Sequence, residues 1–434
     1  MKGWQTHRLG DVVDEGGGSI QTGPFGSQLH ASDYVPEGIP CIMPANLKNN
    51  RVDISGIARI SEHDAKRLKR HIVQTGDIVY SRRGDVTQKA LITERENGFF
   101  CGTGCLLLRP GTKIDSAFLT YYLSTTTYQS WIASQAVGAT MPNLNTGILN
   151  RVSFCAPNKS DQTRIAAALA ALDAKIELNN RINEELEGMA KLLYDYWFVQ
   201  FDFPITAAQS AAMRKPHIKG KPYRASGGKM IYNEALKREI PDGWEGGNIL
   251  AISEIGGGAT PSKKAPEFWG GEVPFFTPTD AKSEPFCLDT EDHITQLGLG
   301  NSATRLYPQG TLFITARGSV GKAMIISRAM AMNQSCYALC PHDGVGSAFL
   351  YFHTLSLMDY LHAKSSGSVF NSIVTNDINF TPAVVPAFQQ LTSFNEVAEP
   401  MFKSILTHQE QNQQLTKLRD WLLPMLMNGQ VTVS

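Results

Sequence analysis

The alternation of hydrophobic and polar positions over residues 161–201 predicts one long amphipathic helix. The run contains no Pro and a single Gly, and its apolar residues recur every three or four positions, the spacing of a coiled-coil stripe. These residues are Ile165, Leu169, Leu172, Ile176, Ile182, Leu186, Met189 and Leu193. About 38 helical residues would span roughly 57 Å, which is too long for one compact domain. We therefore expect a separate domain on each side.

A second apolar stripe of the same kind follows residue 387. Its members are Phe394, Val397, Met401, Ile405, Leu415, Leu418 and Leu422. Pro400 lies inside it, and because Pro lacks the backbone N–H, we expect it to kink the helix or delay its start. Both stripes must be buried, and we expect the two helices to bury them against each other as an antiparallel coiled coil.

The chain contains a long internal repeat. Residues 76–84 (GDIVYSRRG) match residues 310–318 (GTLFITARG), which aligns Arg83 with Arg317 at an offset of 317 − 83 = 234. Three further pairs of segments align at similar offsets: 38–44 with 272–278, 105–110 with 336–341, and 137–144 with 366–373. A period near 230 residues is far longer than that of solenoids or propellers, so it indicates two copies of one domain, each followed by a long helix.

Within each copy, Gly and Pro separate short β-type runs. We predict strands at 39–43, 77–81, 90–93 and 106–108, and helices at 118–134 and 349–363. The fold class is therefore α+β, with two homologous globular domains separated by two long helices in a pseudo-twofold arrangement. The predicted boundaries are 1–157 for the first domain, 158–201 for the central helix, 202–243 for a basic Gly/Pro-rich connector, 244–386 for the second domain and 387–434 for the C-terminal helix.

Charge and cysteine content narrow the function classes. Forty basic and forty acidic residues cancel, which argues against binding nucleic acid by bulk charge. Local excesses remain: residues 59–95 hold nine Lys or Arg against five acids, and residues 203–240 hold eight against two. The seven Cys are scattered, so no disulfide framework is expected. No apolar run is long enough to span a membrane, and we expect a cytoplasmic protein.

Sequence patterns of catalysis are missing. There is no Gly-rich phosphate loop ending in Lys-Ser/Thr and no G-x-S-x-G elbow. Cys101 and Cys105 are four residues apart, as are Cys336 and Cys340. On one extended strand such sulfurs would lie roughly 13 Å apart, so no metal site is expected.

The basic side chains near the repeated Arg-Gly pair are the better binding candidates. They follow a predicted strand and precede Gly84 or Gly318, where a loop could approach a phosphate or a base edge. The candidate DNA-binding residues are Arg82, Arg83, Lys89, Arg317 and Lys322. A structural ion pair remains the alternative for any one of them.

The two apolar stripes share a polar interruption. Heptads continued from Ile176 and Ile405 reach Asn179 and Asn183 in the first helix, and His408 and Asn412 in the second. The positions are equivalent, since 408 − 179 = 229 and 412 − 183 = 229. We expect one buried polar layer that fixes the register of the helices, the alternative being that these groups face water. The candidate spacer and docking residues are Leu169, Leu172, Ile176, Asn179, Leu186, Ile405, His408, Leu415 and Leu422.

Several segments together resemble a known family over essentially the full chain, the specificity subunits of type I restriction–modification systems. They are residues 22–30 (TGPFGSQLH), 141–145 (MPNLN), 161–165 (DQTRI), 194–204 (YDYWFVQFDFP), 221–230 (KPYRASGGKM) and 240–244 (IPDGW).

The resemblance implies a sequence-specific DNA-binding subunit that is not itself an enzyme. Each domain would be a target recognition domain that reads one half of a bipartite, asymmetric site in double-stranded DNA. The helices would set the spacing and dock two methyltransferase subunits, which carry the S-adenosylmethionine, so no cofactor is expected in this chain. The resemblance also allows endonuclease/translocase subunits as further partners, and it implies no association with a membrane. Two alternatives stay open: a stand-alone DNA-modifying enzyme with divergent motifs, and an assembly scaffold that does not touch nucleic acid.

Overall fold

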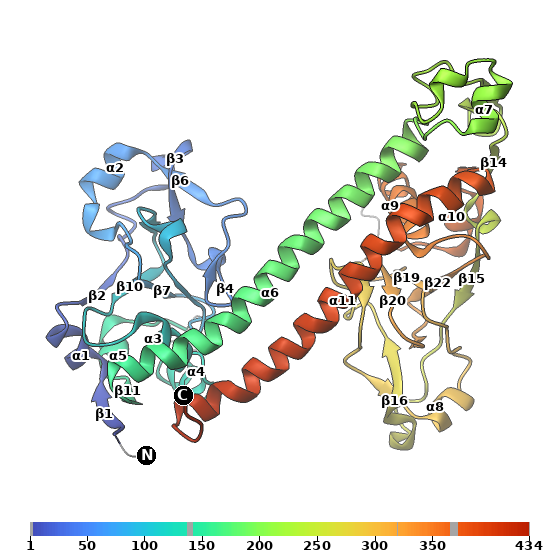
Figure 1. The fold of residues 1–434 in the computed structure, drawn as a ribbon. Helices are drawn as coiled ribbons and strands as arrows, with labels where there is room; N and C mark the ends of the chain where they lie inside the picture. The colour runs from blue at the N-terminus through green and yellow to red at the C-terminus, as the bar shows by residue number, and fades with distance from the viewer. Residues whose placement is uncertain (1–2, 137–141, 319, 365–371, 434) are drawn as a thin grey trace. The chain divides into compact units, whose positions relative to one another are not determined.

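The computed structural model describes residues 3–136, 142–318, 320–364 and 372–433. The chain divides into two compact units, Met1–Ile176 with Gln414–Ser434, and Glu177–Gln413. Each unit holds one copy of the repeated domain together with part of both long helices (Figure 1).

The first unit contains two small sheets and two strand pairs. The larger sheet is antiparallel, in the order β2 (Ser19–Thr22), β10 (Cys105–Arg109), β7 (Ile78–Ser81) and β8 (Lys89–Leu91). The smaller sheet has the order β6 (Ala58–Ile60), β3 (Tyr34–Ile42) and β9 (Phe100–Cys101). Strand β3 is antiparallel to β6 and parallel to β9. The pairs are β1 (Gln5–Arg8) with β11 (Ser153–Ala156), and β4 (Leu47–Lys48) with β5 (Arg51–Val52).

The second unit repeats this topology with one additional strand, β17 (Phe286–Cys287), at the edge of the larger sheet. Its larger sheet has the order β15 (Ser253–Gly257), β22 (Cys336–Pro341), β19 (Leu312–Thr315), β20 (Ala323–Ile326) and β17. Its smaller sheet has the order β18 (His293–Ile294), β16 (Trp269–Phe276) and β21 (Ala331–Met332), again with one antiparallel and one parallel neighbour. Strand β14 (Glu245–Gly247) pairs with β23 (Ala383–Val385) as β1 pairs with β11. The sequence repeat is therefore confirmed as a repeated fold.

Short helices complete each domain. The first domain has α1 (Leu9–Glu15), α2 (Glu62–Arg67), α3 (Ser116–Tyr122), α4 (Thr126–Gln135) and α5 (Thr146–Asn150). The second has α8 (Gln296–Gly300), α9 (Ser347–Lys364) and α10 (Thr375–Phe380). The single helix predicted at 118–134 is wrong, because α3 and α4 are separate. The Ser124 hydroxyl bonds the Thr120 carbonyl and Thr125 is extended, so hydroxyl side chains compete with the helix there.

The two long helices are α6 (Lys159–Tyr194), which ends in a π-helical turn (Asp195–Val199), and α11 (Phe388–Met427). The expectation that Pro400 delays α11 is wrong, since the helix begins twelve residues before it. Burial of Phe394, Ala398 and Phe402 on one face of α11 stabilises the helix on both sides of the Pro and offsets the missing hydrogen bond.

The apolar stripes are buried differently from the expectation. Ile165 and Leu169 of α6 belong to the core of the first domain, and Phe394 and Ile405 of α11 belong to the core of the second. The N-terminal half of each long helix therefore packs into the domain that precedes it in the chain. The other helix is not its only partner.

The predicted polar layer is present within the second unit. Asn179 donates to the Asn412 side-chain oxygen at 2.9 Å, and His408 Nδ1 lies 2.8 Å from the Asn183 side-chain oxygen. Partner numbers fall along α11 as they rise along α6, so the two helices run antiparallel here. Asn179 is fully buried, which excludes the water-facing alternative for that residue. The pairs form between non-equivalent positions, 179 with 412 and 183 with 408.

The connector 202–243 is folded. It contains α7 (Ala207–Ala212) and the hairpin of β12 (Met230–Asn233) and β13 (Arg238–Pro241). Phe203 stacks between Tyr223 and Trp244, with ring centroids 4.6 and 5.1 Å away. These rings are part of the core of the second unit, which gives the basic segment a fixed shape.

A buried ion pair ties two strands of the first domain together. Asp77 accepts two bonds from the Arg109 guanidinium, at 2.8 and 2.7 Å, and a third from the Gln74 backbone N–H at 2.8 Å. In the second domain Thr311 and Cys340 take these positions, 3.7 Å apart. The pair is therefore particular to the first copy.

We expect Asp77→Ala to lower the free energy of unfolding by about 3 kcal/mol, because it leaves the part-buried Arg109 guanidinium and the Gln74 backbone N–H without their acceptor. Urea unfolding of the full chain measures this. Glu62→Ala is the control: it breaks only an exposed pair with Lys66 and should change stability by less than about 0.5 kcal/mol. Equal effects for the two variants would contradict the assignment.

The argument from sulfur separation is wrong for the first cysteine pair. Cys101 ends β9 and Cys105 begins β10, so a turn brings them together rather than one extended strand holding them apart. The interaction of the Cys105 thiol with Cys101 and its burial raise the pKa of Cys105. Among the described residues, no group of three His, Cys, Asp or Glu is placed to hold a metal ion. The described helices include none that is long and apolar enough to cross a membrane.

Candidate nucleic-acid interface

The repeated Arg-Gly pair forms the same turn in both domains. Arg83 follows β7 and Arg317 follows β19, and each precedes a glycine with positive φ, +76° at Gly84 and +81° at Gly318. A side chain at either glycine would be strained in this left-handed conformation. The sequence therefore requires Gly at both turns.

The backbone around the two turns is hydrogen-bonded in the same way. The carbonyls of Arg82 and Ala316 accept from the N–H groups of Leu144 and Ile373, each at 2.9 Å. Arg83 forms an isolated β-bridge with Asn143, and Arg317 forms one with Ser372. The aligned segments 137–144 and 366–373 thus meet equivalent arginines where the structure describes them; residues 137–141 and 366–371 lie outside the described ranges.

Arg83 and Arg317 are both solvent-exposed. Within the described part of the chain, neither guanidinium makes a hydrogen bond or an ion pair with another side chain. The structural ion pair that stood as the alternative is absent among these residues. Two exposed cations at equivalent turns can contact a phosphate or the edge of a guanine.

The other three candidates differ from one another. Arg82 is half-buried, bonds Asn143 Oδ1 at 3.3 Å and lies 5.8 Å from the Phe25 ring centre. Lys322 is exposed and donates to the Ala281 carbonyl at 2.9 Å. Lys89 is only 2% exposed, and burial lowers its pKa to about 7. A buried amine is poorly placed for a DNA phosphate, so Lys89 is the weakest member of the predicted set.

Asp85 shapes the first turn. It accepts from the Thr87 backbone and hydroxyl and from the Gln88 amide, at 2.6–3.0 Å. Burial alone would raise the pKa of Asp85, but these hydrogen bonds together lower it below its ordinary value. Its carboxylate therefore stays ionised and fixes the loop that presents Arg83.

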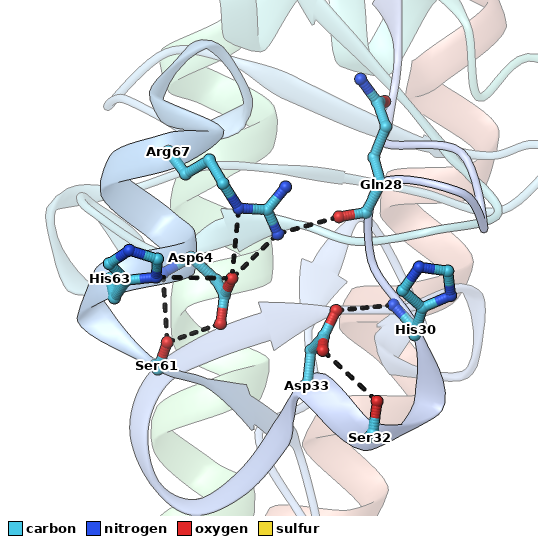
Figure 2. A network of polar contacts seen from close by, with 8 residues as sticks. All are labelled: Gln28, His30, Ser32, Asp33, Ser61, His63, Asp64 and Arg67. Carbon is cyan, nitrogen blue, oxygen red and sulfur yellow. Dashed lines mark hydrogen bonds and ion pairs between the residues drawn. The ribbon is translucent and has the colours of Figure 1, made fainter.

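Within the basic stretch 59–95, the charged side chains of residues 66–70 are largely engaged in local structure. Arg67 bonds Asp64 Oδ1 and the Gln28 carbonyl, and Asp64 in turn bonds the Ser61 hydroxyl that caps α2 (Figure 2). The hydrogen bond from Ser61 and the Arg67 guanidinium lower the pKa of Asp64. Charges held in this way brace α2 against segment 28–33 and offer little to a ligand.

The predicted docking residues are mostly covered. Leu169, Asn179 and Ile405 are buried, whereas the others are half-buried: Leu172, Ile176, Leu186, His408, Leu415 and Leu422. The long helices also expose large apolar residues. Met189 and Leu418 were predicted as members of the buried stripes, and their exposure corrects that expectation. Leu192 and Trp421 are exposed as well and were not singled out from the sequence.

Comparison with known proteins agrees with this geometry. A family model described as "Type I restriction modification DNA specificity domain" matches residues 1–188 and 241–390, one stretch for each copy of the repeat. The specificity subunit of the type I restriction enzyme HindI of Haemophilus influenzae is 25% identical over 478 residues, covering 99% of this chain and 100% of its own length. The MjaIX specificity subunit of Methanocaldococcus jannaschii is 24% identical over 438 residues, covering 100% and 94%.

The fold is also that of a solved relative. The crystal structure of the type I restriction–modification S subunit from M. genitalium superposes with a TM-score of 0.61 at 16% identity, covering 98% of this chain and 96% of that one. A repeated α+β domain, a long central helix and a family match to both copies lead to one conclusion. The chain belongs to the type I restriction–modification specificity subunits, the non-catalytic subunits that give these complexes their DNA sequence specificity.

Proposed function

We propose that each domain reads one half of a bipartite, asymmetric site in double-stranded DNA. The observation that carries the proposal is the equivalent placement of Arg83 and Arg317 at identical turns of the repeated fold. The residues around the turns differ, with Arg82 in the first copy and Ala316 in the second. A shared frame with different side chains supports two half-sites of different sequence.

The long helices serve as spacer and as docking surface for two methyltransferase subunits. Support comes from the apolar side chains that they expose: Met189 and Leu192 on α6, and Leu418 and Trp421 on α11. Exposed apolar groups of this size are typical of protein interfaces. The repeat provides a docking surface in each unit, which favours two copies of the partner.

The S-adenosylmethionine belongs to the partner subunits, and this chain binds none. The complex acts in the cytoplasm, where the DNA is, and an endonuclease/translocase subunit joins it for cleavage. These assignments follow from the family and not from a bound group.

Titration of the purified chain with S-adenosylmethionine in a calorimeter should give no saturable heat. With the partner methyltransferase subunits added, the complex should bind S-adenosylmethionine and methylate one bipartite sequence. The partner subunits alone should methylate no defined site. Saturable binding by the isolated chain would instead favour a stand-alone DNA-modifying enzyme.

A further inference from the structure

A polar pocket of about 250 Å³ lies in the first unit, between the domain and the long helices. It is lined by Asn49, Asn50, Thr87, Gln88, Lys89, Tyr121, Ser124, Gln129, Asp173, Arg419, Asp420 and Leu423. At about 30 Å³ per water, the pocket holds roughly eight waters, or one small metabolite. Nothing in the DNA-reading function requires it.

One wall of the pocket is a closed ionic network. Asp173 accepts from the Tyr121 hydroxyl at 2.6 Å and from Arg419 Nη1 at 2.8 Å. The other two nitrogens of Arg419 bond Asp420 Oδ1, at 2.9 and 2.8 Å. Arg419 therefore pairs with both carboxylates and offsets one of their two negative charges, which leaves this wall with one net negative charge.

Lys89, in contrast, brings a buried positive charge to the pocket. It lines the pocket, is 2% exposed, and lies with its ammonium 5.8 Å from the Tyr80 ring centre. Across the described ranges, the ammonium has no hydrogen-bond acceptor and no carboxylate partner within ion-pair distance. A buried ammonium without an anion is costly, and burial is what lowers the pKa of Lys89 to about 7.

The second copy of the domain shows which residues at these positions are compatible with the fold. At the repeat offsets, Tyr121 corresponds to Phe352 (352 − 121 = 231), Asp173 to Phe402 (402 − 173 = 229) and Arg419 to Ala190 (419 − 190 = 229). Phe352 and Phe402 pack with ring centroids 5.5 Å apart, and Ala190 is fully buried beside them in the same core. Ala323, which is buried, takes the place of Lys89, since Ile314 pairs with Ala323 as Tyr80 pairs with Lys89. The fold is thus stable with apolar groups at these positions, and the polar set in the first copy is not a requirement of folding.

We propose that this pocket binds a small anion that carries a carboxylate or phosphate group, with the Lys89 ammonium as its principal partner. The side-chain amides of Asn50 and Gln129 line the same pocket as neutral donors. A bound anion contacts the domain through Lys89 and faces the Asp173–Arg419 pair of the helices. It therefore stabilises the domain on its helices.

Binding depends on pH through Lys89. The group lies among five other ionisable side chains, Tyr80, Tyr121, Asp173, Arg419 and Asp420. Burial raises the pKa of both tyrosines, and Arg419 pairs with both aspartates. The anion selects protonated Lys89, and its affinity falls as pH rises through about 7.

The test uses the full chain, with acetate and phosphate as separate probes at constant ionic strength and pH 6.5. Melting temperature and calorimetry are measured for the wild type, Lys89→Met and Lys322→Met. We expect saturable stabilisation of the wild type by at least one probe, which also shows whether a carboxylate or a phosphate fits. Lys322→Met should bind as the wild type does, and Lys89→Met at least tenfold more weakly.

Lys89→Met keeps the length of the side chain and removes the buried charge, so we expect it to fold. If the variant does not fold, acetate titrations of the wild type at pH 6.5 and 8.5 test the role of Lys89 instead. Acetate stays ionised across this range, so a change in affinity reports on the protein. Affinity should fall at the higher pH. Absence of saturable binding by either probe, equal binding by Lys89→Met, or an affinity for acetate independent of pH would overturn the proposal. None of these outcomes bears on DNA recognition.

Discussion

Replacing Arg83 or Arg317 by Ala should weaken binding of the assembled complex to its DNA target by about 1–3 kcal/mol each, the cost of losing a base or phosphate contact. Both guanidiniums are exposed and have no side-chain partner among the described residues, so the protein loses no internal side-chain bond. The two turns lie in different units, and the double variant should lose the sum of the single effects.

Fluorescence anisotropy with a labelled target duplex measures the loss. Arg164→Ala is the matched control, because Arg164 is an exposed arginine whose one ion-pair partner in the described part of the chain is the nearby Asp161. It should bind DNA as the wild type does. A lowered melting temperature for Arg83→Ala or Arg317→Ala, with unchanged DNA affinity of the folded protein, would assign the arginines a structural role instead.

Replacing Asn183 and His408 together by Leu should stabilise the protein and broaden the range of spacer lengths accepted between half-sites. The two side chains bond each other at 2.8 Å within the polar layer, so the pair is removed without leaving either partner behind. Replacing both partners by apolar groups is close to neutral or stabilising, whereas one unpaired buried polar group costs about 1–3 kcal/mol. A register slip would no longer be penalised at this layer.

The observed pairing decides which double variant is informative. Asn179 and His408 belong to different pairs, and replacing those two would strand Asn412 and Asn183. Urea unfolding of the two single variants and the double variant of Asn183 and His408 gives the coupling energy, and methylation of duplexes with altered spacers gives the tolerance. A less stable double variant with an unchanged spacer preference would contradict the role in register.

The repeat, the long helices and the polar layer could be predicted because each follows from a regular spacing of residues along the sequence. A conserved offset places Arg83 and Arg317 at equivalent turns, and heptad arithmetic finds Asn183 and His408 without knowledge of the fold. It is harder to predict which surface buries the apolar face of a long helix. Leu169 and Ile405 have the right period for a coiled coil, yet they pack into domain cores, since period alone does not say which apolar surface covers a stripe.

The burial of the charged side chains was the least predictable property. Lys89 and Lys322 each follow the repeated Arg-Gly pair by a few residues, but one is buried and the other exposed, because Lys89 pairs with Tyr80 whereas Ala323, and not Lys322, pairs with Ile314. The pocket around Lys89 joins residues as far apart as 50 and 419, which no local pattern connects. The connector shows the same limit: its Lys, Arg and Gly content indicates a loop, while Phe203 and Tyr223 hold it in a core.

Exchange of one recognition domain tests the account most directly. Residues 1–157 are replaced by the corresponding domain of another family member, chosen to keep apolar contacts for Ile165 and Leu169, and methylated sites are mapped across a genome. The reciprocal exchange replaces residues 244–386. Each exchange should change one half of the recognised sequence and leave the other half and the spacing unchanged. A change in both halves from a single exchange, in a protein that melts as the wild type does, would contradict the assignment of one half-site to each domain.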